Sequence, residues 1–176
     1  MESSNVQNSP GADTQPDDAF TDVFNGHFWG LVRLARLLGA DDPEDVVQDA
    51  FVRLHRKRGV LRDPNATLAY LRSIVCNLSR SRLRHLRMAR RRHAQIAIPD
   101  DARSAEHQAA HREDIRELLE AVGTLPARQR EALVLRYWLD LSERETADTL
   151  GIAVGTVKAH TARAIAALGQ RLEDKK

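Results

Sequence analysis

The sequence has 176 residues, of which 42% are hydrophobic and 30% are charged. This length fits one average domain or two small ones, and the composition excludes a chain that is disordered throughout. No apolar run approaches the ~20 residues that a membrane span needs. The single cysteine, Cys76, excludes an internal disulfide and a thiolate zinc cage. Since the N-terminal residues lack the basic and apolar stretches of an export signal, we expect a cytoplasmic protein.

The net charge of +2 conceals three blocks of opposite sign. Residues 1–25 carry five acids and no Lys or Arg, residues 53–92 carry thirteen basic residues and one acid, and residues 99–120 carry seven acids and three arginines. A basic run is often only a solvated helix face. Here the run is nearly all arginine, whose guanidinium groups match phosphate oxygens. We therefore expect residues 53–92 to bind nucleic acid.

Apolar residues recur at intervals of three and four along most of the chain, so the expected fold is all-α. An apolar stripe from Phe20 to Leu38 predicts a first helix, which Gly39 ends in a left-handed conformation. Asp42 and Pro43 predict the cap and first turn of a second helix, which runs to about residue 58. The first residues, 1–18, are expected to form a disordered acidic tail.

The second helix is expected to present two different faces. Its inward side should hold Val47, Ala50, Phe51 and Leu54. Four polar residues and one valine should face outward, namely Glu44, Asp45, Gln48, Asp49 and Val46. A mixed acidic and apolar face of this kind is typical of a surface for a protein partner.

Asp63 and Pro64 repeat the signal of a cap followed by proline and predict a long third helix. Its apolar stripe thins after Leu78, and seven arginines fall among residues 80–92. This end should project along the surface and face nucleic acid. Residues 95–113 contain a Pro-Asp-Asp break and little to bury, so they are interpreted as a linker between two small helical domains, 19–94 and 114–174.

His107 and His111 in this linker have the spacing of zinc ligands, but no third ligand or catalytic glutamate accompanies them. No metal or cofactor is therefore expected.

The second half predicts a helix-turn-helix. Ser142 and Glu145 form a capping box that opens one short helix, and Gly151 turns the chain into a last helix. The inward residues of that last helix should be Val157, Thr161, Ala164, Ile165, Leu168 and Leu172. Lys158, His160 and Arg163 should point away from this stripe, as on a helix that reads the major groove. The alternative is an ordinary helical hairpin, since Ala147 and Gly151 alone form a common pattern.

Taken together, these motifs resemble the extracytoplasmic-function (group IV) sigma factors of the sigma-70 family, in their actinobacterial form. The resemblance covers residues 20–172 and depends on DPEDVVQDAFVRL (42–54), AYLRSIVCNL (69–78) and LPARQREALVLRY (125–137), followed by VGTVK (154–158). It implies a protein that is not an enzyme but binds core RNA polymerase, recognises the minus-ten and minus-thirty-five promoter elements and promotes melting. The implied partners are the clamp helices of the largest polymerase subunit, the flap of the second largest, promoter DNA and an anti-sigma factor.

The resemblance also implies residue roles. Asp45, Gln48, Asp49 and Arg53 would contact the polymerase clamp helices. The minus-ten element would be bound by the loop 59–67, where a flipped base would need a pocket, and by the helix after it, through Asn65, Tyr70, Arg72, Asn77, Arg80, Arg82, Arg84 and Arg87. The minus-thirty-five element would be contacted by Thr156, Lys158, Ala159, His160, Ala162 and Arg163. The acidic linker would thread polymerase channels that hold nucleic acid.

Two departures from the family pattern bear on these roles. Ser81 and Leu83 stand where the subgroup often has Asp and Trp, so melting should depend more on charge. Ala153 stands where a capping serine is usual, and the alanines at 159 and 162 remove polar base contacts, so minus-thirty-five reading should depend on shape, methyl contacts and Arg163.

Two other classes of protein are alternatives. An autonomous helix-turn-helix regulator usually dimerises on palindromic sites, and no strongly apolar dimerisation helix is visible here. A nuclease or other enzyme would need carboxylates or histidines clustered in a pocket, whereas the acids here lie on caps, linker and tail.

Overall fold

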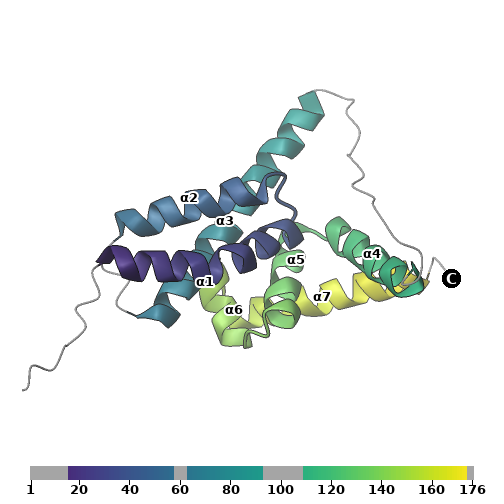
Figure 1. The fold of residues 1–176 in the computed structure, drawn as a ribbon. Coiled ribbons are helices and arrows are strands. Elements are labelled where there is room, and N and C mark those ends of the chain that lie inside the picture. Colours follow the sequence, from purple (N-terminus) through teal and green to yellow (C-terminus); the bar gives the residue numbers. More distant parts are fainter. Residues whose placement is uncertain (1–15, 58–62, 93–108, 174–176) are drawn as a thin grey trace, which may run out of the picture.

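The structure is a computed structural model, and it describes residues 16–57, 63–92 and 109–173. All regular elements in these ranges are helical, which confirms the all-α prediction (Figure 1). In chain order they are α1 (Pro16–Leu37), α2 (Pro43–Arg56), α3 (Pro64–Arg92), α4 (Ala109–Thr124), α5 (Ala127–Leu133), the π-helical segment η2 (Val134–Trp138), α6 (Glu143–Leu150) and α7 (Val154–Glu173).

The first three helices pack against one another, and α2 contacts both α1 and α3. An aromatic cluster joins α1 to α2, with the ring centroid of Phe24 4.8 Å from that of Phe28 and 4.9 Å from that of Phe51. From α3, Leu71 and Val75 complete this core and are fully buried. The C-terminal end of α3 extends beyond the other helices, as the thinning of its apolar stripe predicted (Figure 1).

The predicted helix boundaries are confirmed at four positions. The Asp42 side chain accepts a hydrogen bond from the Asp45 amide at 3.2 Å, with Pro43 in the first turn. Gly39 and Gly151 adopt the left-handed φ angles of +85° and +65° after the ends of α1 and α6. Ser142 and Glu145 make the reciprocal hydrogen bonds of a capping box at the start of α6.

The predicted outward face of α2 and the predicted inward face of α7 are each wrong in one residue. Val46 is fully buried rather than outward, because α2 packs between α1 and α3 and so buries a face wider than one stripe. Ile165 is 47% exposed rather than inward, because α7 contacts mainly α5 and α6 and buries a narrower stripe, with Val157 and Ala164 at its centre.

The predicted tail and linker lie mostly outside the described residues, which omit 1–15, 58–62, 93–108 and 174–176. Where the structure describes their ends, both are helical: α1 already begins at Pro16, and α4 begins at Ala109. Four of the five residues 58–62 belong to the loop 59–67 assigned to the minus-ten element, so that part of the assignment also falls outside the described residues.

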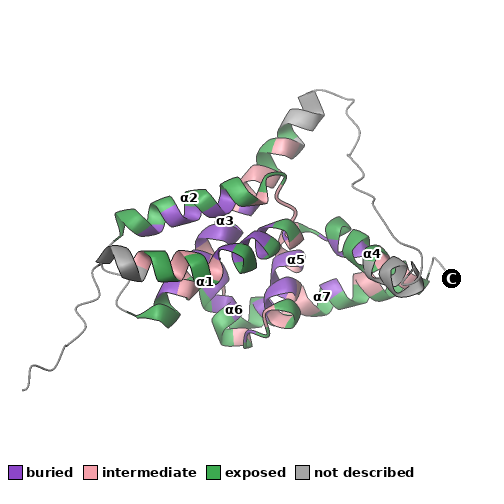
Figure 2. Cartoon of the chain, viewed as in Figure 1, coloured by how far each residue is buried: buried purple, intermediate pink, exposed green. Residues whose placement is uncertain are grey.

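The second half, α4 to α7, does not stand apart from the first. Buried residues of both halves form one hydrophobic cluster, which includes Leu71 and Val75 of α3 together with Leu135 and Leu150. Figure 2 shows buried segments on helices of both halves. Helix α6 packs on α3, and α4 contacts α1. In the described part of the chain the two halves therefore share one core.

The helix that begins as α5 changes its winding at Val134. The Leu139 amide donates to the Val134 carbonyl oxygen at 3.2 Å, the five-residue spacing of a π-helix. Val134 and Leu135 point into the core, whereas Tyr137 and Trp138 remain more than half exposed.

Candidate polymerase and nucleic-acid interfaces

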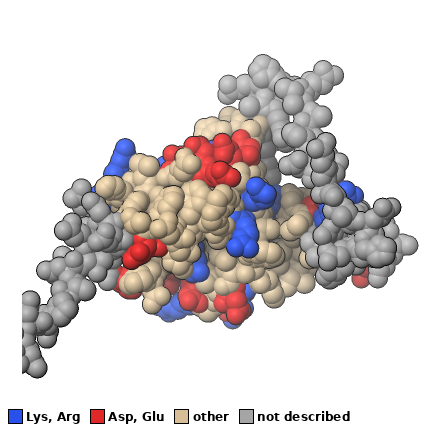
Figure 3. Space-filling model, in the orientation of Figure 1, with Lys and Arg blue, Asp and Glu red and all other residues tan. Residues whose placement is uncertain are grey.

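The acidic face of α2 is exposed as predicted. Asp45, Gln48, Asp49 and Arg53 all lie at the surface, and Figure 3 shows acidic side chains gathered over this helix. Both aspartates accept hydrogen bonds from Nη2 of Arg82 on α3, Asp49 at 3.3 Å. The hydrogen bond that Arg82 donates to Asp45 raises the pKa of the Arg82 guanidinium above its ordinary value. Arg82, which was assigned to DNA binding, is thus hydrogen-bonded to Asp45 and Asp49, which were assigned to polymerase binding.

Three residues assigned to the minus-ten element line one groove between α3 and α6. Asn65, Tyr70 and Arg72 form the α3 side of this groove, which has a volume of about 630 Å³. Its other side is α6, which contributes the carboxylates of Glu145 and Asp148. The partial burial of Arg72 lowers the pKa of its guanidinium, and the charge of Glu145 opposes that shift.

Lys57, at the end of α2, covers the Tyr70 ring, with Nζ 4.8 Å from the ring centroid. A cation over an aromatic face is a favourable contact.

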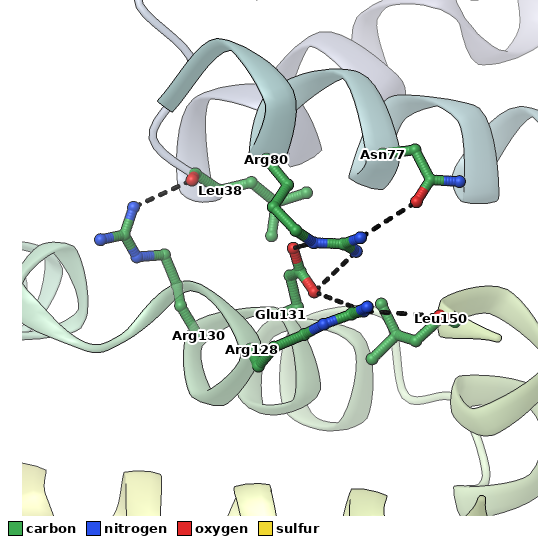
Figure 4. A network of polar contacts seen from close by, with 7 residues as sticks. All are labelled: Leu38, Asn77, Arg80, Arg128, Arg130, Glu131 and Leu150. Carbon is green, nitrogen blue, oxygen red and sulfur yellow. Dashed lines mark hydrogen bonds and ion pairs between the residues drawn. The ribbon is translucent and has the colours of Figure 1, made fainter. Parts of the chain in front are cut away.

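Two more of these residues, Asn77 and Arg80, are not among those that line the groove: Arg80 reaches α5, and Asn77 contacts Arg80 (Figure 4). Nε of Arg80 lies 2.7 Å from Oε1 of Glu131, and Nη2 lies 2.9 Å from Oε2. Nη1 of Arg80 donates to the Asn77 side chain at 3.1 Å. The Arg80 guanidinium is therefore held by other residues of this chain on all three nitrogens.

The minus-ten residues therefore do not form one surface in this arrangement. Arg82 lies against α2, Arg80 against α5, and Arg84 is exposed further along α3. The side chain of Arg87 lies outside the described residues.

The last two helices form the predicted helix-turn-helix. Gly151 caps α6, and the Ile152 amide donates to the Ala147 carbonyl oxygen at 3.1 Å, so the turn is tight. Val157 is fully buried at the start of α7. Among the residues assigned to the minus-thirty-five element, Thr156, Lys158, Ala162 and Arg163 are exposed, and Ala159 and His160 are partly buried.

The residue before α7 is Ala153, which offers no side-chain cap. Its carbonyl oxygen accepts from the Thr156 amide at 2.9 Å and the Val157 amide at 3.1 Å. Nζ of Lys158 lies 3.4 Å from Oε2 of Glu143 at the start of α6. This ion pair is exposed, and exposed ion pairs contribute little to the stability of the fold.

Sequence reasoning assigned no role to Arg130 and Glu131, although both are almost fully buried. Arg130 donates to the carbonyl oxygens of Leu38 at 2.9 Å, Val122 at 3.1 Å and Leu125 at 3.2 Å, and also to that of Gly123. The spacing of the sequence could have indicated this burial. Arg130 lies four residues before the apolar Val134, and Glu131 lies four residues before the apolar Leu135, so both fall on the inward face of the helix.

The described residues contain no group of three or more His, Cys, Asp or Glu side chains arranged to hold a metal ion. None of the described helices combines the length and the apolar character needed to cross a membrane. The geometry points instead to an exposed acidic face on α2, polar and basic residues on α3, and a helix-turn-helix at α6 and α7.

Comparisons with known proteins agree with this geometry. Residues 30–91 match the family described as Sigma-70 region 2, and residues 115–168 match the family described as Sigma-70, region 4. The ECF RNA polymerase sigma factor SigM of Mycobacterium tuberculosis is 35% identical over 156 residues, which cover 88% of this chain and 77% of SigM. The RNA polymerase sigma-E factor of Streptomyces avermitilis is 35% identical over 149 residues, covering 82% of this chain and 80% of that protein.

Solved structures share the fold. The sigma factor RpoE of Bartonella quintana, in complex with the anti-sigma factor NepR, superposes with a TM-score of 0.71 at 24% identity and covers 89% of this chain and 98% of RpoE. CnrH, in complex with the cytosolic domain of CnrY, gives a TM-score of 0.63 at 27% identity over 91% of each chain. The chain therefore belongs to the extracytoplasmic-function sigma factors of the sigma-70 family, which recognise promoters for RNA polymerase and initiate transcription.

Proposed function

We propose that the exposed face of α2 docks on the clamp helices of the largest polymerase subunit. The observation that carries this proposal is the paired carboxylates of Asp45 and Asp49, which lie on one helix face, half-exposed, with Arg82 beneath them. Gln48 and Arg53 extend the same exposed face. An acidic face of this kind complements basic residues of a partner and speeds their encounter.

The two DNA-binding roles belong to different halves of the chain. Residues 19–94 form the unit for polymerase and the minus-ten element, and residues 114–174 form the unit for the minus-thirty-five element and the flap of the second largest subunit. The family matches over 30–91 and 115–168 support this division. Residues 95–113 join the two units and thread the polymerase channels, while residues 1–18 precede the first unit.

At the minus-ten element, Asn65, Tyr70, Arg72, Asn77, Arg80, Arg84 and Arg87 contact the DNA, and Arg82 contributes where it is released from α2. Leu83 does not stack on a base of the minus-ten element. The half-buried Leu83 lies near Gly39, since a Cβ at Gly39 would be 3.7 Å from Leu83 Cδ2. Melting accordingly depends on arginine contacts to the backbone and on a flipped base.

At the minus-thirty-five element, α7 enters the major groove. The exposed side chains of Thr156, Lys158, Ala162 and Arg163 support this role, with Ala159 and His160 beside them. Two of the six residues are alanines, so polar base contacts fall mainly to Arg163 and Lys158, and methyl contacts and DNA shape supply the remainder.

The protein works in the cytoplasm, where promoters and polymerase are, and is a non-enzymatic initiation factor without a metal or cofactor. An anti-sigma factor is a further partner, and support comes from RpoE and CnrH, whose structures were solved with NepR and the cytosolic domain of CnrY. An autonomous helix-turn-helix regulator would instead give a tight specific footprint without core polymerase.

The docking proposal is tested by replacing Asp45 and Asp49 with asparagine. This change keeps the side-chain shape and removes both charges, so affinity for core polymerase in a fluorescence titration should fall at least about tenfold. The matched control replaces two exposed acids on other helices, Asp22 of α1 and Glu173 of α7, with their amides and should keep wild-type affinity. Equal affinities for both double variants, with unchanged circular dichroism, would exclude the α2 face as the docking surface.

A further inference from the structure

Lys57, at the C-terminal end of α2, is absent from the residues assigned to polymerase or to DNA. Its backbone amide donates to the Leu54 carbonyl oxygen at 2.8 Å, so the residue closes the helix, and its side chain is exposed. That side chain turns toward α3, where Nζ lies 4.8 Å from the centroid of the Tyr70 ring. Since Tyr70 is partly buried against the core, its ring holds the ammonium group at a defined place beside α3.

The charge of Lys57 is not neutralised by a carboxylate among the residues that the structure describes. Asp63, at the start of α3, accepts a hydrogen bond from the Asn65 amide at 2.9 Å instead. By contrast, Arg80 and Arg82, which were assigned to the minus-ten element, both contact carboxylates of this chain. An ammonium group has three N–H donors, and an aromatic ring leaves some of them available for an anion.

The neighbouring residue Arg56 shows that the direction of the Lys57 side chain is specific. Arg56 is also exposed, but it lines a cavity of about 580 Å³ between α1 and α2, together with Phe20 and Phe51. Two adjacent cations at the end of α2 therefore diverge, Arg56 toward α1 and Lys57 toward α3. Because the minus-ten residues lie on α3, Lys57 is the one of these two cations that lies beside them.

We propose that Lys57 is a further minus-ten contact, whose ammonium group binds the backbone phosphate of the unpaired nucleotide whose base meets Tyr70. Proteins bind single strands by stacking bases on aromatic side chains and by placing cations along the backbone, and this pair supplies one of each. Because Tyr70 positions the ammonium group before DNA arrives, binding costs less side-chain entropy. This inference rests on the proposed function, from which it takes the DNA role of Tyr70.

The first test measures how the polymerase holoenzyme binds a promoter fragment whose minus-ten segment is mismatched and therefore single-stranded. Lys57→Met keeps an unbranched apolar stem and removes the charge. The slope of log K against log salt should become shallower by about 0.7, the value for one phosphate contact on a single strand, and affinity at about 0.15 M salt should fall about fourfold. Lys57→Arg should keep the wild-type slope, and so should the matched control Arg56→Met, which removes the same charge one residue earlier.

The second test locates the phosphate on the DNA. Methylphosphonate linkages along the minus-ten strand of the same fragment replace one charged phosphate at a time with a neutral group. One position should weaken binding by the wild-type and Arg56→Met holoenzymes but leave binding by the Lys57→Met holoenzyme unchanged, because that variant has already lost the contact. If every position weakens Lys57→Met as much as wild type, the proposal is overturned.

The two proposals fail separately. If the wild-type holoenzyme does not bind the mismatched fragment, the minus-ten role in the proposed function is wrong. If it binds, and folded Lys57→Met has the wild-type salt slope, the contact with Tyr70 serves the fold alone and the proposal for Lys57 is wrong. A loss of affinity for core polymerase by Lys57→Met, measured by fluorescence titration without DNA, would also overturn it, because Lys57 would then be a polymerase contact.

Discussion

Gly39 leaves the space that the guanidinium of Arg130 occupies: a Cβ at Gly39 would lie 2.2 Å from Nη1 of Arg130. Gly39 follows α1 in the first half of the chain, and Arg130 belongs to α5 in the second. The same guanidinium donates to Leu38, beside Gly39, and to carbonyl oxygens at the end of α4. A cation at the C-terminal ends of two helices satisfies carbonyls that have no partner within the helix and interacts favourably with both dipoles.

Gly39→Ala should destabilise the protein for two separate reasons. The left-handed φ of +85° costs an alanine about 1–2 kcal/mol, and the new methyl group forces Arg130 away from Leu38. Gly26→Ala is the matched control, because Gly26 lies inside α1 with nothing within 4 Å of its Cβ position, so the change should stabilise by about 1 kcal/mol. Urea unfolding measures both, and equal signs for the two variants would contradict this account.

Arg130→Lys should cost about 3 kcal/mol of unfolding free energy, since buried carbonyl oxygens that lose their donor cost about 1–3 kcal/mol each. An ammonium group is a point charge and cannot reproduce the planar fork that reaches Leu38, Val122 and Leu125 together. Arg144→Lys on the exposed face of α6 should change stability by less than ~0.5 kcal/mol. A similar small change at Arg130 would show that its hydrogen bonds contribute little.

Ser142→Ala should remove about 1 kcal/mol by deleting the N-cap of α6. The effect should depend on pH, because hydrogen bonds from Ser142 hold the pKa of Glu145 below its ordinary value. A lowered pKa in the folded state adds stability above the ordinary carboxyl pKa, and this contribution is lost as pH falls through the folded value. The difference between wild type and Ser142→Ala should therefore shrink on acidification below about pH 4.

Glu145→Gln is the control for this pH dependence. It keeps the Ser142 hydroxyl but removes the titrating group. A Ser142→Ala effect that stayed constant from neutral to acidic pH would assign the whole loss to the serine hydroxyl bond alone.

The sequence predicted local boundaries well and long-range pairing poorly. The helix ends at Gly39, Asp42 and Ser142 are set by φ preferences and by hydrogen bonds that span three residues, so their signals lie side by side in the chain. The pair between Arg80 and Glu131 joins residues 51 positions apart, and no local spacing specifies it. The only indication in the sequence that the Glu131 carboxylate is buried is its position four residues before the apolar Leu135, on the inward face of the helix.

Val46 shows a second limit of sequence reasoning. Its burial follows from the position of α2 between two other helices, which a stripe on one helix does not reveal. The same holds for the candidate site. The minus-ten element was assigned to a loop and the helix after it, and the separate neighbours of Arg82, Arg80 and Arg72 on α2, α5 and α6 turn these residues in different directions.

Arg163→Ala should weaken binding of the polymerase holoenzyme to promoter DNA by about 1–3 kcal/mol when the minus-thirty-five bases are intact and by much less when they are scrambled. The expectation follows from the exposed position of Arg163 on α7 and from the alanines at 159 and 162 beside it. Filter binding with paired promoter fragments measures the difference. An equal loss on both fragments would make Arg163 a phosphate contact.

Cys76 should report opening of the contact between α3 and α5. Burial, with a further contribution from the charge of Glu131, raises the pKa of the thiol to about 12 from an ordinary 9.0. Since the thiolate is the reactive form, this shift alone should slow alkylation at pH 8 roughly a thousandfold relative to the unfolded chain. The thiol ionises first in the unfolded state, so its contribution to stability is complete below about pH 9 and is lost as pH rises toward 12.

Iodoacetamide labelling followed by mass spectrometry measures the alkylation rate of Cys76. Gly39→Ala should increase this rate and Gly26→Ala should not. Equal rates in the two variants would place Cys76 outside the opening motion.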